Sequence, residues 1–179
     1  MSTILESTTA VPTGTWNADP VHSSVGFSVK HMVVGTFKGA FGTFTAQLVD
    51  GALKGAATVS SVRVDDENLN GHLLSPDFFD AERFPEITFS SGPLRVENGS
   101  IVADGELELR GVKQPVQLKG TIAGPAADPY GGTRVGLELE AIVDRTAFGV
   151  SWNQELPSGG QAVGNEVKLT AELELVKEA

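Results

Sequence analysis

Apolar and polar residues alternate along most of this chain, with the period of two that is typical of β-strands with one buried face. In the segment 25–31, Val25, Phe27, Val29 and His31 fall on one face. Similar alternation recurs in the segments 36–48, 56–64, 87–89, 94–96, 101–109, 116–122, 135–143 and 167–175. Gly and Pro separate these segments, so the pattern predicts about eight to ten strands joined mostly by short turns.

Two glycines mark changes of direction within this pattern. The alternation changes phase near Gly42, between Phe41 and Phe44, which predicts a bulge or a sharp bend. Asn98-Gly99 lies between two apolar segments, and both residues tolerate positive φ. This dipeptide therefore predicts a tight hairpin with a type I′ turn.

One segment, 65–82, departs from the strand period. Leu69 and Leu73 have helical spacing, and Ser75-Pro76-Asp77 has the residues of a helix start, with a capping Ser, a Pro at the first position and an early acid. We expect one or two short helices here. The segments 124–133 and 151–165, rich in Gly and Pro, are predicted to be longer loops.

Strands that are apolar on one face must hide that face, either in an up-and-down barrel or in a sandwich. Long strands and local connections favour the all-β barrel, and an eight-stranded barrel can enclose one small ligand. Gly14-Thr15-Trp16 has the G-x-W pattern with which lipocalins begin, where the Trp closes the barrel base. We predict one β-barrel domain over 14–179 and a disordered N-terminal tail over 1–13.

The composition excludes several classes of function. Among 179 residues there is no Cys, which removes disulfides, thiol nucleophiles and Cys-ligated metals. The net charge of -10 argues against nucleic-acid binding and against electrostatic docking on anionic membranes. Because no apolar run approaches the roughly 18 residues of a membrane span and the N-terminus lacks the features of a secretion signal, we expect a cytoplasmic protein without stable membrane insertion.

Catalytic and metal-binding motifs are weak in this sequence. The histidines His22, His31 and His72 lack metal-ligand spacing, and His31 alone is in phase with an apolar strand face. No G-x-S-x-G elbow is present, and the alternating glutamates are typical of a solvated outer wall. We therefore expect no catalytic residue and no required metal. A small-molecule enzyme or metal-dependent protein using His22, His31 and Arg145 inside the barrel remains the alternative.

Several segments taken together, in their order and spacing, resemble the YceI family of polyisoprenoid-binding proteins. They are WNADPVHS (16–23), VGFSVKHM (25–32), GTFKGAF (35–41), HL (72–73), SPDFFD (75–80), FPEITFSS (84–91), GEL (105–107), RGV (110–112) and RTAFG (145–149). The resemblance covers about residues 14–176. It implies an eight-stranded, lipocalin-like antiparallel barrel with a helical insertion. It also implies that a long isoprenoid or isoprenoid quinone binds in an apolar pore. Many members of the family are periplasmic.

These observations together predict a lipid carrier or storage protein. The strand phase places on the inner wall Val25, Phe27, Val29, Phe37, Ile87, Phe89, Val135, Leu137, Leu139 and Phe148. Phe78 and Phe79 are expected at the mouth, Trp152 among the lining aromatic residues, and His31 and Arg145 as donors to a ligand head group. The expected partner is an apolar lipid, such as a polyisoprenoid or isoprenoid quinone, and a homodimer is left open.

Overall fold

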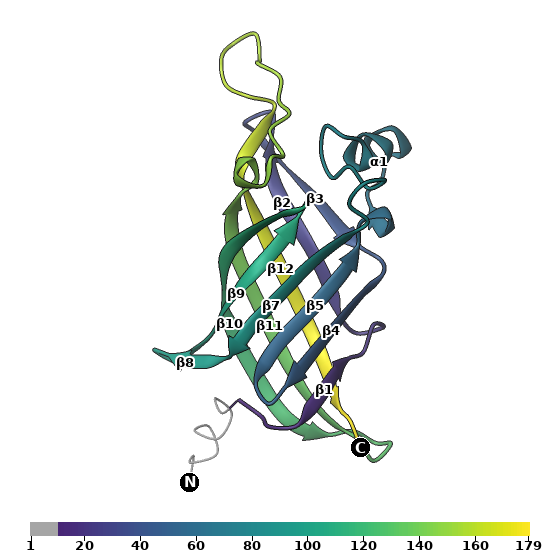
Figure 1. Cartoon of the computed structure of the whole chain (residues 1–179), viewed down its shortest axis with the longest axis vertical. Coiled ribbons are helices and arrows are strands. Elements are labelled where there is room, and N and C mark those ends of the chain that lie inside the picture. The colour runs from purple at the N-terminus through teal and green to yellow at the C-terminus, as the bar shows by residue number, and fades with distance from the viewer. Residues whose placement is uncertain (1–10) are drawn as a thin grey trace.

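The computed structural model describes residues 11–179, and β-strands form most of it (Figure 1). The strands are β1 (Thr15–Ala18), β2 (Ser24–His31), β3 (Gly35–Phe41), β4 (Phe44–Val49), β5 (Ala52–Thr58), β6 (Val62–Arg63), β7 (Glu86–Pro93), β8 (Arg95–Glu97), β9 (Ser100–Leu109), β10 (Val112–Ala127), β11 (Thr133–Asp144) and β12 (Val163–Lys177). The helix α1 spans Glu67–Leu74, and two short 3₁₀ helices span Val59–Ser61 and Arg145–Phe148.

Eight of these strands close into an antiparallel ring, which confirms the predicted barrel. The ring runs β1-β4-β5-β7-β9-β10-β11-β12, and β12 pairs back with β1. The chain thus hides its apolar strand faces by closure, which also removes the exposed edges of an open sheet.

Two positions in the barrel wall next to β12 are each occupied by two shorter strands, β1 with β2 and β4 with β3. β1 and β2 pair with successive parts of β12, at Trp16↔Lys177 and Phe27↔Leu169. β4 then pairs with β1, and β3 with β2. These divided positions, together with the two-residue β6, explain why the structure has twelve strands where the sequence predicted eight to ten.

The strand β3 has a partly unpaired edge. On the side away from β2, its ladder partners among the described residues are in β6, opposite Ala40 and Phe41. We call residues 35–39 the open edge of β3. In Figure 1, β2 and β3 lie at the upper end of the barrel, near α1.

β1 and the C-terminus lie at the lower end of the barrel in Figure 1. A cluster of buried apolar side chains packs at this end. Leu48, Leu137 and Leu175 are fully buried there. Trp16 is buried with them, and its Nε1 donates a hydrogen bond to the Thr13 carbonyl at 2.9 Å. The G-x-W segment therefore closes the barrel base, as the sequence predicts, and we call this region the closed end.

Two turn predictions are confirmed by the backbone. Asn98 and Gly99 both have positive φ, 51° and 80°, between β8 and β9. Near Gly42 the chain passes from β3 to β4, and the Gly42 amide donates to the Ser61 carbonyl. By contrast, the predicted loop 124–133 is shorter than expected, because β10 continues to Ala127.

The helical insertion begins and ends at residues other than those predicted. α1 follows Asp66, whose side chain accepts a hydrogen bond from the Leu69 amide at 2.9 Å and so caps the helix. Ser75, predicted to begin a helix, instead ends α1, and its Oγ donates to the His72 carbonyl. The prediction of a helix start at Ser75-Pro76-Asp77 is therefore wrong.

The predicted tail, 1–13, lies outside the described residues except for 11–13. Within that short stretch, Val11 packs against the core of the closed end. The Gly14 amide donates to Asp50 Oδ1 at 2.9 Å, which fixes the entry into β1.

Candidate functional site: an apolar cavity in the barrel

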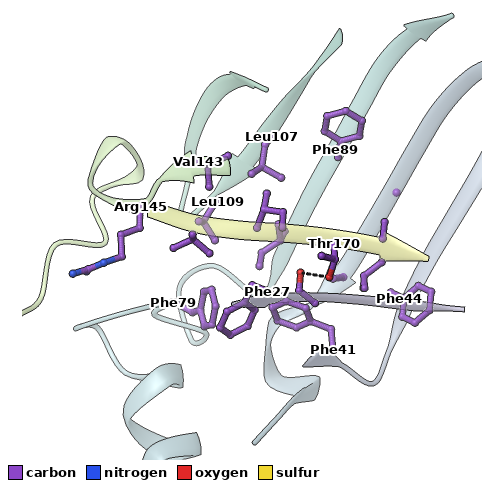
Figure 2. Close-up of a pocket in the computed structure, with 18 of the residues that line it drawn as sticks. Phe27, Phe41, Phe44, Phe79, Phe89, Leu107, Leu109, Val143, Arg145 and Thr170 are labelled. Carbon is purple, nitrogen blue, oxygen red and sulfur yellow. Dashed lines mark hydrogen bonds between the residues drawn. The ribbon is translucent and has the colours of Figure 1, made fainter. Parts of the chain in front are cut away.

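The barrel encloses a cavity of about 270 Å³ above the closed end. Seven phenylalanines belong to its wall: Phe27, Phe37, Phe41, Phe44, Phe78, Phe79 and Phe89. Figure 2 shows Phe27, Phe41 and Phe79 close together, with Leu107, Leu109 and Val143 across the space from them. No Asp or Glu is part of the wall among the residues that the structure describes. The cavity can therefore bind an apolar molecule without neutralising a buried carboxylate.

Ten of the fifteen predicted site residues lie on this wall. They are Val25, Phe27, Val29, His31, Phe37, Phe78, Phe79, Ile87, Phe89 and Arg145. The alternation of apolar and polar residues thus identified the inward face of β2 and β7, because side chains on a strand point alternately to its two faces.

The other five predicted site residues do not line the cavity. Val135, Leu137 and Leu139 point inward but are packed in the core of the closed end. Phe148 is buried beside the wall, and Trp152 packs outside it against Phe78. The three β11 residues face the barrel interior as predicted, but strand phase specifies only a face and not which of its residues border the cavity. The role of all five in ligand binding stays a prediction.

Several wall residues were not predicted. They include Phe41, Phe44, Leu107, Leu109, Val116, Val143 and Leu169. Each is an apolar residue in an alternating segment, so the signal was present. What the sequence lacks is the register between strands, which determines the residues that meet at one height.

The upper part of the wall is an aromatic cluster. The ring of Phe27 lies 5.9–6.1 Å from the rings of Phe37, Phe41 and Phe79, measured between centroids. Phe79, from the segment after α1, also contacts Phe41 edge-on at 5.9 Å. Tilted and edge-on contacts at this distance are favourable for aromatic pairs. Phe79 therefore attaches the helical insertion to β2 and β3 through side chains alone.

A second aromatic group attaches α1 to the loop after the helix Arg145–Phe148. The ring of His72 packs edge-on against both Phe78 and Trp152, with centroid distances of 4.9 and 4.8 Å. The Nε2 atom of His72 also lies 3.0 Å from Asp77 Oδ2. His72 therefore has packing and hydrogen-bonding partners at the upper end of the barrel and lies outside the cavity wall.

Arg145 has a structural role that the sequence did not predict. Its guanidinium donates to three carbonyls, of Gly164 at 2.8 Å, Val150 at 2.7 Å and Val163 at 3.3 Å. Burial lowers the pKa of Arg145 from its ordinary value, but arginine remains charged in proteins. In Figure 2 the guanidinium points away from the labelled phenylalanines. The stem of Arg145 thus lines the cavity while its charged end fixes the loop.

His22 lies outside the cavity, in the turn between β1 and β2. Its side chain is 63% exposed, and Nδ1 lies 2.9 Å from Asp19 Oδ2 and 3.5 Å from Glu174 Oε2. The hydrogen bond with Asp19 raises the pKa of His22, and the same bond lowers the pKa of Asp19. The alternative in which His22, His31 and Arg145 act together inside the barrel is therefore wrong in its placement of His22.

The group Asp19, His22 and Glu174 has the spacing of a metal site, but it already contains a cation. Arg134 Nη1 lies 2.9 Å from Asp19 Oδ2 and 3.7 Å from Glu174 Oε2. Because this guanidinium neutralises the carboxylates that would bind a metal ion, the group is best described as an ion-pair network.

His31 is the polar residue at the upper end of the cavity. It ends β2, is exposed, and pairs in the ladder with Val163. No hydrogen-bond partner of its ring is found among the described residues, so its nitrogens are free to contact a ligand or solvent. We call the upper opening next to His31 the mouth. Between residues 11 and 179, no helix has the length and apolar character needed to cross a membrane.

Comparisons with known proteins agree with this architecture. A family profile described as YceI-like domain matches residues 16–175. A UPF0312 protein of Staphylococcus epidermidis is 33% identical over 168 residues, covering 89% of this chain and 95% of the relative. A UPF0312 protein of Staphylococcus aureus is 32% identical over 165 residues, with 87% and 94% coverage.

Solved structures share the fold at lower identity. Burkholderia cenocepacia BcnA superposes with a TM-score of 0.76 at 23% identity, covering 88% of this chain and 98% of that one. A Campylobacter jejuni YCEI protein gives 0.70 at 24% identity, with 90% and 96% coverage. A polyisoprenoid binding domain from Saccharophagus degradans gives 0.70 at 13% identity, with 91% and 98% coverage.

Proposed function

Because the chain belongs to the YceI-like family, we propose that it binds a long isoprenoid, or an isoprenoid quinone, in the barrel cavity. We propose further that it acts as a carrier or storage protein for this lipid. The name of the structurally similar Saccharophagus degradans domain supports the class of ligand. Binding of an apolar lipid requires neither a catalytic group nor a metal.

The observation that carries this proposal is the composition of the cavity wall. Its charged side chains are Lys30 and Arg145, near the mouth, and the remaining wall is apolar apart from His31 and three threonines. A prenyl chain has no charge and few hydrogen-bonding groups, so its affinity must come from buried apolar area. An apolar wall with seven phenylalanine rings supplies such area.

The shape of the cavity also favours a chain over a compact ring system. Val25 and His31, six residues apart on β2, both line the wall, and this spacing corresponds to about 20 Å of strand. A space of about 270 Å³ distributed along that length is narrow. Covering roughly 500 Å² of ligand at ~25 cal/mol per Å² would contribute about 12 kcal/mol before the cost of ordering the chain.

The head group belongs at the mouth in this proposal. His31 is the polar residue whose ring nitrogens have no partner among the described residues, and a neutral imidazole can donate to a quinone carbonyl. Arg145 is a weaker candidate than its sequence position suggested, because its guanidinium already donates to three carbonyls.

The proposal is tested by extracting lipids from natively purified protein with organic solvent and identifying them by mass spectrometry. We expect a co-purified prenyl lipid in a molar ratio near one. The variant Phe89→Asp places a carboxylate inside the cavity and should lose the lipid. Ser90→Asp adds the same charge on the outer face of the same strand and should retain it.

Two outcomes would contradict the proposal. The first is protein that neither carries a prenyl lipid nor takes one up when incubated with prenyl quinone. The second is a folded Phe89→Asp variant, with the circular dichroism spectrum of the wild type, that retains the lipid in full.

A further inference from the structure

Three consecutive apolar residues are exposed beside the mouth. Met32, Val33 and Val34 form the turn between β2 and β3, and they are 43%, 61% and 90% exposed. They follow His31 directly, so they stand at the rim of the cavity. Runs of exposed apolar residues are disfavoured on soluble proteins unless they have a function. We call these three residues the apolar tip.

The backbone of the apolar tip is strained by its own sequence. Met32 and Val33 have φ angles of 53° and 68°, in the left-handed region. Gly or Asn adopts this conformation at little cost, whereas a β-branched residue such as Val33 is a rare outlier there. The chain therefore places bulky apolar side chains at a turn where small or polar residues would fold more easily, and such strain points to a function of the tip.

The two chain segments that form the rim beside the apolar tip contain no charged residue. Neither 32–37 nor 156–165 contains Asp, Glu, Lys or Arg, although the chain has 36 such residues and a net charge of -10. The two segments touch, because the Met32 amide donates to the Ala162 carbonyl at 2.8 Å. In Figure 1 the loop before β12 projects furthest at this end of the barrel. These two segments thus give the mouth a rim without acidic residues on an acidic protein, and the charged residues near it are Lys30 and Arg145.

We propose that the apolar tip inserts into the interfacial layer of an electrically neutral lipid bilayer and so places the mouth against the membrane. The inference rests on the proposed function, because a prenyl lipid resides in membranes and must enter the cavity from one. Insertion of the side chains of Val33 and Val34 would contribute affinity by burial of apolar area. The negative net charge disfavours an anionic surface and so selects a neutral one.

A second copy of the chain fits the apolar tip less well. A stable interface buries about 800 Å² on each partner, and three side chains at a turn provide only part of that area. Insertion into a bilayer requires no matching surface, so three side chains on a rim are sufficient for weak, reversible binding.

The proposal is tested by flotation of the full chain with phosphatidylcholine vesicles. The double variant Val33→Asn/Val34→Asn removes the apolar side chains and should fold, because Asn tolerates positive φ at position 33. We expect the fraction bound to fall by about tenfold or more. The matched control is Val21→Asn, at an exposed valine in the turn between β1 and β2, and it should bind like the wild type. Vesicles with added phosphatidylglycerol should bind less well at low salt, and the difference should shrink as salt is added.

A solution assay separates this proposal from the proposed function. Both the wild type and the double variant should bind farnesol in the absence of vesicles. If the wild type binds farnesol but the double variant still floats with vesicles, the apolar tip is not the docking site. If the double variant changes the sedimentation mass of the protein, the tip serves association between copies and the membrane proposal is overturned. Failure of the wild type to bind farnesol or prenyl quinone would count against the proposed function instead.

Discussion

Phe27 lies directly opposite Gly39 across the β2–β3 ladder, and its ring covers the glycine. A Cβ atom built on Gly39 would lie 2.5 Å from the Cζ atom of Phe27, closer than such contacts occur. The absence of a side chain at position 39 therefore allows the Phe27 ring to lie flat against the barrel wall. This pairing keeps the cavity open at the aromatic cluster.

The substitution Gly39→Ala should displace the Phe27 ring into the cavity. We expect a loss of prenyl-quinone affinity of about tenfold and a destabilisation of about 1–3 kcal/mol, because overpacking forces rings off their preferred rotamers. Fluorescence titration and urea unfolding measure the two effects. Gly71→Ala, in α1, is the control, since an added Cβ there meets nothing within 4 Å. Unchanged affinity in Gly39→Ala would show that Phe27 has room elsewhere.

The pair Leu137 and Leu173 distinguishes the cavity floor from the closed end. The two residues are opposite each other in the β11–β12 ladder and both are buried, but only Leu173 lines the cavity. Each Leu→Ala change should cost about 2–5 kcal/mol in the free energy of unfolding. Only Leu173→Ala should deepen the cavity and shift the preference toward longer prenyl chains. Competition between prenyl quinones of different chain length measures this shift, and an equal shift in Leu137→Ala would contradict it.

Arg145 is expected to act on stability through its three carbonyl contacts. Arg145→Met removes the side-chain donor to the carbonyls of Val150 and Gly164 and leaves the Val163 carbonyl with the Asn153 donor, so it should destabilise the fold by about 2–4 kcal/mol in urea unfolding. Arg145→Lys keeps the charge but not the planar fork, so it should recover only part of the loss. Full stability of the lysine variant would mean that charge alone matters at this position.

The contact between His22 and Asp19 should make the turn between β1 and β2 sensitive to pH. Because the folded protein raises the pKa of His22 above its ordinary value of 6.5, the protonated ring stabilises the turn below that value. This contribution is lost as the pH rises through the raised pKa. Asp19 behaves in the opposite sense, because its pKa is lowered. Its contribution is present above the ordinary carboxyl range and is lost as the pH falls through the lowered pKa.

A titration of the His22 ring signals by nuclear magnetic resonance measures this effect. The midpoint should lie above 6.5 in the wild type and should fall in Asp19→Asn, because the largest cause of the shift is the Asp19 hydrogen bond. Glu174→Gln should lower it less, since Glu174 acts only through its charge. A wild-type midpoint at or below 6.5 would contradict the contact.

The sequence predicted those features that local chemistry determines. Asn98-Gly99 indicated its hairpin because two residues of positive φ are a local requirement, and Phe27 and Phe89 were placed on the inner wall by the period of two. Leu137 shows the limit of this reasoning. Its phase correctly points inward, but Leu137 is packed in the core while Leu173, its ladder partner, borders the cavity, and no local pattern distinguishes the two.

Other features depend on contacts between segments that are distant in the sequence. Arg145 looked like a ligand donor because its partners are backbone carbonyls, which every residue has and which leave no mark in the sequence. Ser75 fits a helix start and a helix end equally well, and the capping of α1 by Asp66 decides between them. The sequence shows three consecutive apolar residues at Met32-Val33-Val34. It does not show that they are exposed or that Met32 and Val33 have positive φ angles.

The open edge of β3 gives the barrel two parts of different compliance. Along the closed ring, any widening must break ladder hydrogen bonds. Around β2, β3 and β6, by contrast, the wall is continued on one side by the side chains of Phe79 and its neighbours. Side-chain contacts can separate and re-form without loss of backbone hydrogen bonds. The width of the mouth can therefore change while the closed end keeps its shape. The same barrel can therefore admit ligands of different girth at its mouth while its floor still limits how deeply each one enters.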